Sequence, residues 1–164
     1  MSTQTTLLVS PQVLQAIGEH AISCYPEEAC GLLVGNIASS EVLEFHACEN
    51  IAHSAKVYTI NPKQHLVIER NAEDAGLEVV GVVHSHTHTE AYPSSTDVAQ
   101  APDPGWHYMI VTLKRGSLNR EISALLKGLF PKRQFRSTTN HWPFLRARIM
   151  TNAVNNPQFA HDDQ

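Results

Sequence analysis

The 164-residue chain lacks the features that mark several large classes of protein. It contains no uninterrupted apolar stretch approaching the ~18 residues of a transmembrane helix, so we expect no membrane span or membrane partner. Residues 1–6 show no basic run leading into a long apolar stretch, which argues against a secretory signal. Lys and Arg total 12 against 16 Asp and Glu, a formal net charge of −4, so the basic surface typical of nucleic-acid-binding proteins is not expected.

Cysteine is also scarce, because Cys24, Cys30 and Cys48 are the only three in the chain. An odd number of cysteines cannot all pair within one chain, so we expect reduced thiols and a cytoplasmic protein. Hydrophobic residues make up 42% of the chain and charged residues 17%, which is ordinary for a folded domain and too apolar for a disordered one. The length is that of one domain.

The hydrophobic pattern predicts a mixture of helices and strands. Helices are predicted where apolar residues recur every three or four positions, and strands where short runs are apolar or β-branched. The predicted helices are Pro11–Cys24, Pro62–Ala75 and a short one within Ser94–Gln100. The predicted strands are Thr6–Val9, Ala29–Val34, Glu41–Ala47, Val57–Ile60, Val79–Val83, His107–Leu113 and Glu121–Leu126. This mixture indicates an α+β or α/β domain.

Histidine is abundant, with ten in the chain, and His84, His86 and His88 lie close together after the predicted strand Val79–Val83. If the strand continues, residues two apart point to the same face, and His84 and His86 can reach one metal ion. His88 would join them only if the strand ran further. Because the residues after His86 are predicted to form a loop, we expect His88 either to contact the metal ligands without binding the metal itself or to lie at the surface.

Asp97 is the third candidate ligand, since the loop after His86 is long enough to fold back and bring this carboxylate to the same ion. Two histidines, one carboxylate and a water form a catalytic zinc arrangement. Asp97 also fits a helix capping box in which Ser94 is the N-cap residue. Capping is the simpler interpretation of Asp97 taken alone, and the two roles do not exclude each other.

A zinc hydrolase also needs a general base beside the water. Glu28 is our candidate, because it directly precedes the predicted buried strand Ala29–Val34 and so lies at a sheet edge. Taken alone, the sequence favours the simpler interpretation that Glu28 is a solvated loop acid. Glu27 and Glu90 remain rival candidates on the same grounds.

These residues together resemble a known family. His84 and His86, seven further residues, Ser94, two residues and Asp97 form the pattern H-x-H-x7-S-x2-D of the JAMM (also called JAB or MPN+) zinc metallopeptidases. Upstream, residues 26–35 (PEEACGLLVG) resemble the first strand block of that family, in which an essential Glu stands two residues before Cys-Gly. The resemblance runs from about residue 8 to residue 126.

The resemblance implies a cytidine-deaminase-like JAB/MPN fold. This is an α+β (α/β/α-like) domain with a mixed, largely antiparallel curved sheet flanked by helices. It further implies a metallopeptidase domain in residues 1–130, followed by a partly flexible C-terminal extension in residues 131–164.

The same resemblance implies that Zn²⁺ is held by His84, His86 and Asp97, with a water in the fourth position. Glu28 would take a proton from this water and pass it to the leaving amine, while Ser94 would stabilise the oxyanion together with the metal. The Ser94 hydroxyl therefore has two candidate uses, capping and catalysis, and the sequence leaves both open. Cys30 is expected to be a small core residue and not a nucleophile.

The loop Thr89–Ser94 (TEAYPS) is similar to the bacterial stand-alone branch of the family typified by Mec, as are Asn50, Ser54, Tyr58 and His107-Tyr108. This similarity implies that the partner is a ubiquitin-like sulfur-carrier protein ending in Gly-Gly. The expected reaction is hydrolysis of the bond after Gly-Gly, which releases cysteine or a short C-terminal extension in cysteine or thiocarboxylate metabolism. We leave open whether the protein forms a homodimer.

Two other functions are compatible with the resemblance. One is an isopeptidase that removes ubiquitin-like modifiers from other proteins. The other is a non-catalytic MPN scaffold that has lost its metal. Because all three candidate ligands, Glu28 and Ser94 are present, the sequence favours the enzyme over the scaffold.

Overall fold

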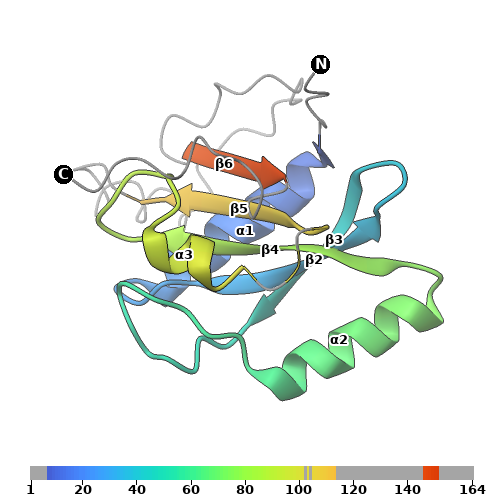
Figure 1. Cartoon of the computed structure of the whole chain (residues 1–164), viewed down its shortest axis with the longest axis horizontal. Coiled ribbons are helices and arrows are strands. Elements are labelled where there is room, and N and C mark those ends of the chain that lie inside the picture. Colours follow the sequence, from blue (N-terminus) through green and yellow to red (C-terminus); the bar gives the residue numbers. More distant parts are fainter. Residues whose placement is uncertain (1–6, 102, 104, 114–145, 152–164) are drawn as a thin grey trace.

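The computed structural model describes residues 7–101, 103, 105–113 and 146–151. Within them, the helices are interspersed among the strands along the chain (Figure 1). The helices are α1 (Pro11–Cys24), α2 (Pro62–Asp74) and α3 (Ser95–Ala99). The strands are β1 (Leu8–Val9), β2 (Cys30–Asn36), β3 (Glu41–Cys48), β4 (Glu78–His86), β5 (His107–Thr112) and β6 (Arg146–Thr151).

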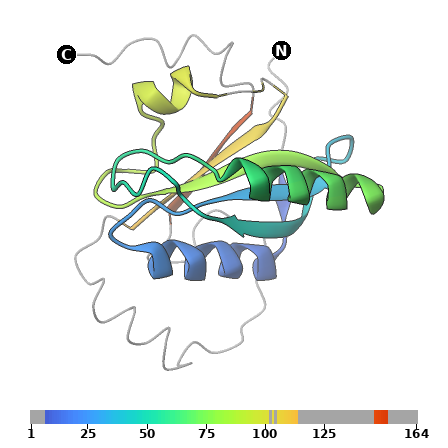
Figure 2. The same cartoon turned by 90° about the horizontal axis from the view of Figure 1, so that it is seen from below.

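The strands form one mixed sheet in the order β1-β3-β2-β4-β5-β6. The pairs β2–β3, β2–β4 and β5–β6 are antiparallel, whereas β1–β3 and β4–β5 are parallel. Helices flank this sheet, with α1 along one side and α3 on the other in the view of Figure 2. The predicted fold class, a mixed and largely antiparallel sheet flanked by helices, is confirmed.

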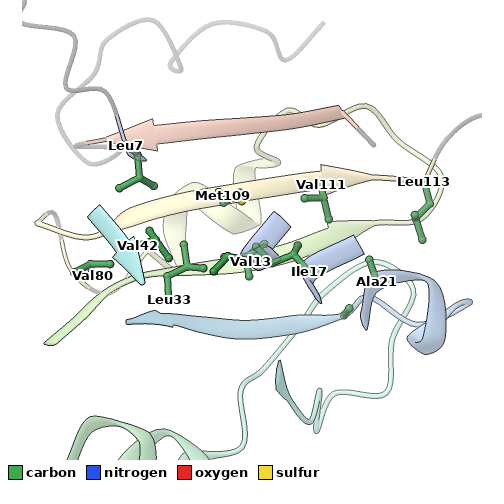
Figure 3. Close-up of a cluster of buried hydrophobic side chains, with 12 residues drawn as sticks. Leu7, Val13, Ile17, Ala21, Leu33, Val42, Val80, Met109, Val111 and Leu113 are labelled. Atoms are coloured by element: carbon green, nitrogen blue, oxygen red, sulfur yellow. The ribbon is translucent and has the colours of Figure 1, made fainter. Parts of the chain in front are cut away.

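Helix α1 covers one face of the sheet. It begins at the N-cap Ser10, whose side chain accepts a hydrogen bond from Val13 N, and it carries proline in its first turn, as predicted. Val13, Ile17 and Ala21 recur at helical spacing, so they share one face and pack against sheet residues that include Leu33 and Met109 (Figure 3). This cluster holds α1 against the middle of the sheet.

Helix α2 contributes to a second apolar cluster. Asn61 is its N-cap residue, and its Ile68 and Ala72 pack with sheet residues that include Leu32 and Val82. Strand β2 is buried from Cys30 to Gly35, because its successive side chains contribute to both clusters. The prediction of a strand buried on both faces is therefore confirmed.

Glycine sets the spacing of two strand pairs. A Cβ atom at Gly81 in β4 would collide with the carbonyl oxygen of His107 in β5, and one at Gly35 in β2 would collide with the carbonyl oxygen of Glu41 in β3. Both strand pairs therefore depend on the missing side chain.

Several predicted elements differ from the structure. The predicted strand Val57–Ile60 is wrong: this segment is irregular, and only Ile60 forms a β-bridge, to Asn50. Strand β4 runs three residues beyond its predicted end, through His86. Strand β6 was not predicted and lies within the range assigned to the C-terminal extension. The predicted strand Glu121–Leu126 lies outside the described residues.

None of the helices that the structure describes has both the length and the apolarity needed to cross a lipid bilayer.

Candidate metal centre

Two candidate ligands lie at the C-terminal end of strand β4. His84 and His86 are the last alternate residues of the strand, on the same face as Val82 of the second apolar cluster. Both are buried, with exposed fractions of 3% and 5%. Because alternate residues of a strand share a face, the two imidazoles lie side by side at the end of β4.

Ser85, between the two histidines, points to the opposite face and connects β4 to the start of β2. Its hydroxyl accepts a hydrogen bond from Ala29 N at 2.8 Å, and its own amide donates to Ala29 O at 2.9 Å. Because Ala29 follows Glu28, these two bonds fix the candidate base relative to both histidines. The motif spacing alone gives no sign of this role of Ser85, because it depends on a contact with Ala29 in a distant segment.

The third candidate ligand, Asp97, lies in the first turn of α3. Ser94 caps this helix: its hydroxyl accepts from Asp97 N at 3.1 Å, and Asp97 Oδ2 accepts from Ser94 N at 2.7 Å. The Ser94 hydroxyl also donates to Asp97 Oδ2 at 2.7 Å. The predicted capping box is therefore present, and it holds the Asp97 carboxylate in one orientation.

The capping role does not remove Asp97 from the histidines. Its Oδ1 lies 3.3 Å from His84 Nε2, and its Oδ2 lies 3.3 Å from His86 Nε2. The two Nε2 atoms are 3.1 Å apart. Among the described residues, these three form the one group of three or more His, Cys, Asp or Glu residues close enough to share a metal ion.

The spacing of this group fits zinc. Bonds of about 2.0–2.1 Å in tetrahedral geometry place ligand atoms roughly 3.3–3.4 Å apart. The two nitrogens are 3.1 Å apart, and each lies 3.3 Å from one of the two Asp97 oxygens, so these separations are close to that edge length. Two imidazole nitrogens and one carboxylate oxygen are also donors that zinc accepts, and they leave a fourth position for water.

His86 is oriented by the loop that follows it. Its Nδ1 lies 2.9 Å from Glu90 O and 3.0 Å from the Thr89 hydroxyl. A proton on Nδ1, donated to the Glu90 carbonyl, leaves the Nε2 lone pair free for a metal. His88 is exposed, and its Nδ1 lies 2.6 Å from the Thr87 hydroxyl, so it does not join the ligand group.

Burial and hydrogen bonds together set the charges of His84, His86 and Asp97. Burial opposes the charge of Asp97, but hydrogen bonds from His84 and His86 hold the pKa of its carboxyl well below the usual range. Burial lowers the pKa of His84. Burial also opposes the charged form of His86, but the hydrogen bond to Asp97 raises the pKa of that imidazole. The carboxylate is therefore ionised and available to a cation.

Glu28 lies at the entrance to β2, as predicted, and is 4% exposed. Its Oε2 is buried and has no hydrogen-bond partner among the described residues. Burial raises the pKa of its carboxyl to about 7, with His86 lowering it and Asp97 raising it through their charges. A carboxyl with a pKa near neutrality can both accept and release a proton, as a general base and acid must.

The rival bases are placed differently. The Glu27 side chain is 42% exposed, and its Oε2 lies 3.4 Å from His53 Nδ1. Glu90 is also exposed, and its carbonyl oxygen is the group that contacts His86. Of the three candidates, Glu28 alone is buried beside the ligand group.

The loop between β3 and α2 lies beside the site, and the side chain of Asn50 holds the backbone of this loop in place. The Asn50 Nδ2 donates to Glu28 O at 3.0 Å and to Val57 O at 3.2 Å, while its Oδ1 accepts from the amides of Ala52 and Thr59 at 3.0 Å each. The Glu28 amide in turn donates to Ser54 O at 2.8 Å. In the sequence, only the resemblance to the family points to Asn50 and Tyr58.

The cysteines do not form an additional nucleophilic site. Cys30 and Cys48 are buried, and burial raises the pKa of the Cys30 thiol to about 12. Burial also raises the pKa of Cys24 and Cys48. Their thiols stay protonated, which agrees with the prediction that Cys30 is a core residue.

Comparisons with known proteins agree with this geometry. Among curated proteins, the chain is similar to the CysO-cysteine peptidase of Mycobacterium tuberculosis, with 36% identity over 68% of this chain and 77% of that protein. It is also similar to the desampylase of Haloferax volcanii, with 34% identity over 60% of this chain and 71% of that protein.

The fold is shared with solved structures. A protein of Desulfitobacterium hafniense superposes with a TM-score of 0.62 and 28% identity, covering 67% of this chain and 77% of that one. A protein of Salinibacter ruber superposes with a TM-score of 0.52 and 31% identity, covering 68% of this chain and 76% of that one.

The family comparison covers most of the described structure. Residues 10–124 match the family described as prokaryotic homologs of the JAB domain. This range includes the candidate site residues Glu28, His84, His86, Ser94 and Asp97. The chain therefore belongs to the prokaryotic JAB-domain family, as its sequence motifs predicted.

Proposed function

We propose that this protein is a zinc-dependent peptidase that hydrolyses the bond after the C-terminal Gly-Gly of a small ubiquitin-like sulfur-carrier protein. The observation that carries the proposal is the group formed by His84, His86 and Asp97, whose separations fit tetrahedral zinc, beside the buried carboxyl of Glu28. Peptidase-named relatives that match about two thirds of the chain support it.

In this proposal His84, His86 and Asp97 hold the zinc ion. When bound, zinc supplies a Lewis acid that lowers the pKa of a water and polarises the scissile carbonyl. Glu28 takes the proton of the attacking water and delivers it to the leaving amine. Its pKa of about 7 suits both transfers.

Ser94 has two tasks in this proposal. Its hydroxyl caps α3 through Asp97 and is also the proposed donor to the oxyanion. To donate to the oxyanion, the hydroxyl must turn away from Asp97 Oδ2, while the amides of Ser94 and Asp97 keep the helix start in place. Loss of one oxyanion donor typically costs on the order of 10²–10³ in rate.

The substrate follows from the names of the relatives and from the resemblance of the loop Thr89–Ser94. An extended Gly-Gly tail has no side chains to obstruct its approach to a buried centre. We propose that cleavage releases cysteine or a short C-terminal extension, and that the protein acts in the cytoplasm. We also propose a peptidase domain in residues 1–130, with residues 131–164 as its extension.

The test is incubation of the purified protein with a ubiquitin-like carrier that bears residues beyond Gly-Gly, read by mass spectrometry. Loss of those residues alone, prevented by a chelator and restored by zinc, is the expected result. Cleavage only of a carrier joined to a lysine side chain would instead support the isopeptidase. A protein that binds no zinc and cleaves neither substrate would support the scaffold. A zinc-loaded protein that cleaves neither substrate would also overturn the proposal.

A further inference from the structure

We propose that Tyr58 is a positioning residue for the ligand His84: its ring packs flat against the imidazole and fixes the direction in which Nε2 faces the metal. The inference rests on the proposed zinc site and adds a residue to it. Tyr58 has no assigned function in that site, and it comes from the irregular loop between β3 and α2.

The two histidines are held in different ways. His86 is oriented through Nδ1, which lies 2.9 Å from Glu90 O. The Nδ1 of His84 is buried and has no hydrogen-bond partner among the described residues. Metal-binding histidines are usually oriented by a hydrogen bond to the second nitrogen, so His84 lacks the usual means of fixing its ring.

Tyr58 supplies a different restraint on His84. The two ring centroids are 4.4 Å apart and the ring planes are inclined by only 21°, which is a stacked arrangement. A stacked ring resists tilting of the imidazole about an axis in its plane, because tilting brings the two rings into collision. The other ring contact of His84, to His86, is tilted at 54° and lies along the ligand side.

Asn50 holds the backbone on both sides of Tyr58. Its Nδ2 donates to the carbonyl of Val57, and its Oδ1 accepts from the amide of Thr59. The same side chain donates to the carbonyl of Glu28. Asn50 is 7% exposed, and its amide group makes all four hydrogen bonds available to it, so the position of Tyr58 is fixed relative to Glu28 as well.

The phenol group is not itself a suitable ligand. Burial raises the pKa of Tyr58, and the nearby charges of Asp97 and Glu28 raise it further. The hydroxyl therefore stays protonated at neutral pH. We assign the effect of Tyr58 to the face of its ring and not to its oxygen.

The test compares zinc affinity in four proteins: wild type, Tyr58→Phe, Tyr58→Leu and Phe45→Leu. Phe45 is the matched control, because its ring also lies beside a histidine, His20, at 5.8 Å, but packs with the α1 cluster. Zinc dissociation constants are measured by competition with a chromophoric chelator. Thermal unfolding of the metal-free proteins reports how much each change costs in stability.

We expect Tyr58→Phe to bind zinc within about threefold of wild type and Tyr58→Leu to bind it 10–100-fold more weakly, the usual effect of losing a group that orients a ligand. Phe45→Leu should keep wild-type affinity even where its metal-free form melts earlier. Should Tyr58→Leu not fold, Tyr58→Met, which fills similar space without a ring plane, should show the same loss.

Different failures have different meanings. Wild-type affinity in Tyr58→Leu or Tyr58→Met would overturn the positioning role and leave the zinc peptidase intact. Equal losses in Tyr58→Phe and Tyr58→Leu would overturn it too, because they would assign the effect to the hydroxyl. A wild-type protein that binds no zinc would overturn the proposed function itself.

Discussion

At the scale of single residues, Glu28 is buried, although its proposed role requires its carboxyl to gain and lose a proton. Its Oε2 has no hydrogen-bond partner among the described residues, and its pKa is raised from 4.5 to about 7. When the pKa of a carboxyl is higher in the folded protein than in the unfolded chain, its protonation stabilises the folded state. This stabilisation is complete only at pH values below the pKa in the unfolded chain. That contribution is lost as pH rises from about 4.5 to about 7.

Glu28→Gln should therefore separate activity from stability. We expect cleavage to fall by at least ~10², because the general base is lost, while zinc remains bound. At pH 8 the metal-free variant should be more stable than wild type by roughly 1–3 kcal/mol, because no charge has to be buried. Steady-state rates, zinc analysis and denaturant unfolding measure the three effects.

The matched control is Glu27→Gln, since Glu27 is the neighbouring acid and its side chain is 42% exposed. It should change none of the three quantities appreciably. An active Glu28→Gln variant, or an inactive Glu27→Gln variant, would reassign the base.

His107 makes stability depend on pH in the opposite direction. It is 5% exposed, its Nδ1 has no partner among the described residues, and burial lowers its pKa. At pH values above about 6.5, the pKa of histidine in the unfolded chain, His107 is neutral and its burial is compatible with a stable fold. As the pH falls below that value, this contribution to stability is lost. His107→Asn should flatten the loss of stability between pH 7.5 and 5.5.

The effect of one such group cannot exceed about 1.4 kcal/mol per pH unit. Denaturant unfolding of the metal-free protein at several pH values measures it. His53→Asn is the control, because the His53 side chain is 64% exposed and asparagine tolerates its positive φ of 47°. If both variants keep the wild-type slope, His107 is not the source of the pH dependence.

At the scale of elements, strand β4 carries the two candidate ligands His84 and His86, and their position depends on the distance between β4 and β5. Gly81 permits that distance, because a Cβ atom there would collide with the carbonyl oxygen of His107. His84 and His86 lie only a few residues further along the same strand. Pushing β4 away from β5 at Gly81 should therefore also displace the ligands.

Gly81→Ala should lower stability by about 1–3 kcal/mol and weaken zinc binding by the folded protein. Gly35→Ala creates a comparable collision with Glu41 of β3, away from the ligands. It should cost similar stability but leave zinc affinity unchanged. Chemical denaturation and chelator competition, run on both variants, measure the difference. Equal affinities in the two variants would show that the β4–β5 spacing does not control the site.

The elements also show how far the sequence could predict this molecule. Helix α1 and strands β2 and β5 were predictable because proline, apolar spacing and β-branched runs act locally. The composition of Val57–Ile60 is β-like and predicts a strand, whereas hydrogen bonds from Asn50 hold this segment as an irregular loop. Such long-range hydrogen bonds leave no periodic signal in a sequence.

The candidate site was predictable as a list of residues but not as an arrangement. The motif spacing predicts His84, His86 and Asp97 as ligands, and the upstream block predicts Glu28 as the base. The structure brings the three ligand candidates within reach of one ion. Burial of Glu28 and the stacking of Tyr58 against His84 depend on contacts between distant segments. Only the folded chain reveals them.

At the scale of the whole molecule, the candidate ligands come from β4 and α3, and the candidate base lies just before β2. A metal that binds this folded arrangement and not the unfolded chain must stabilise the whole domain. Zinc at 100 times its dissociation constant should add about 2.7 kcal/mol, which corresponds to a rise of roughly 5–10 °C in Tm.

Differential scanning calorimetry with and without zinc measures this shift. His84→Ala, which removes one ligand, should show little or no shift at the same zinc concentration. An equal shift in wild type and in His84→Ala would place the stabilising zinc elsewhere on the protein.

The double use of Asp97 affects how mutational data on this protein should be read. Because one carboxylate both begins α3 and faces the histidines, alanine at this position removes a helix start together with a ligand. Asparagine keeps an oxygen for the amide of Ser94 but not the negative charge. Of the two substitutions, asparagine is the one that separates the cost of local unwinding from the cost of a missing anion.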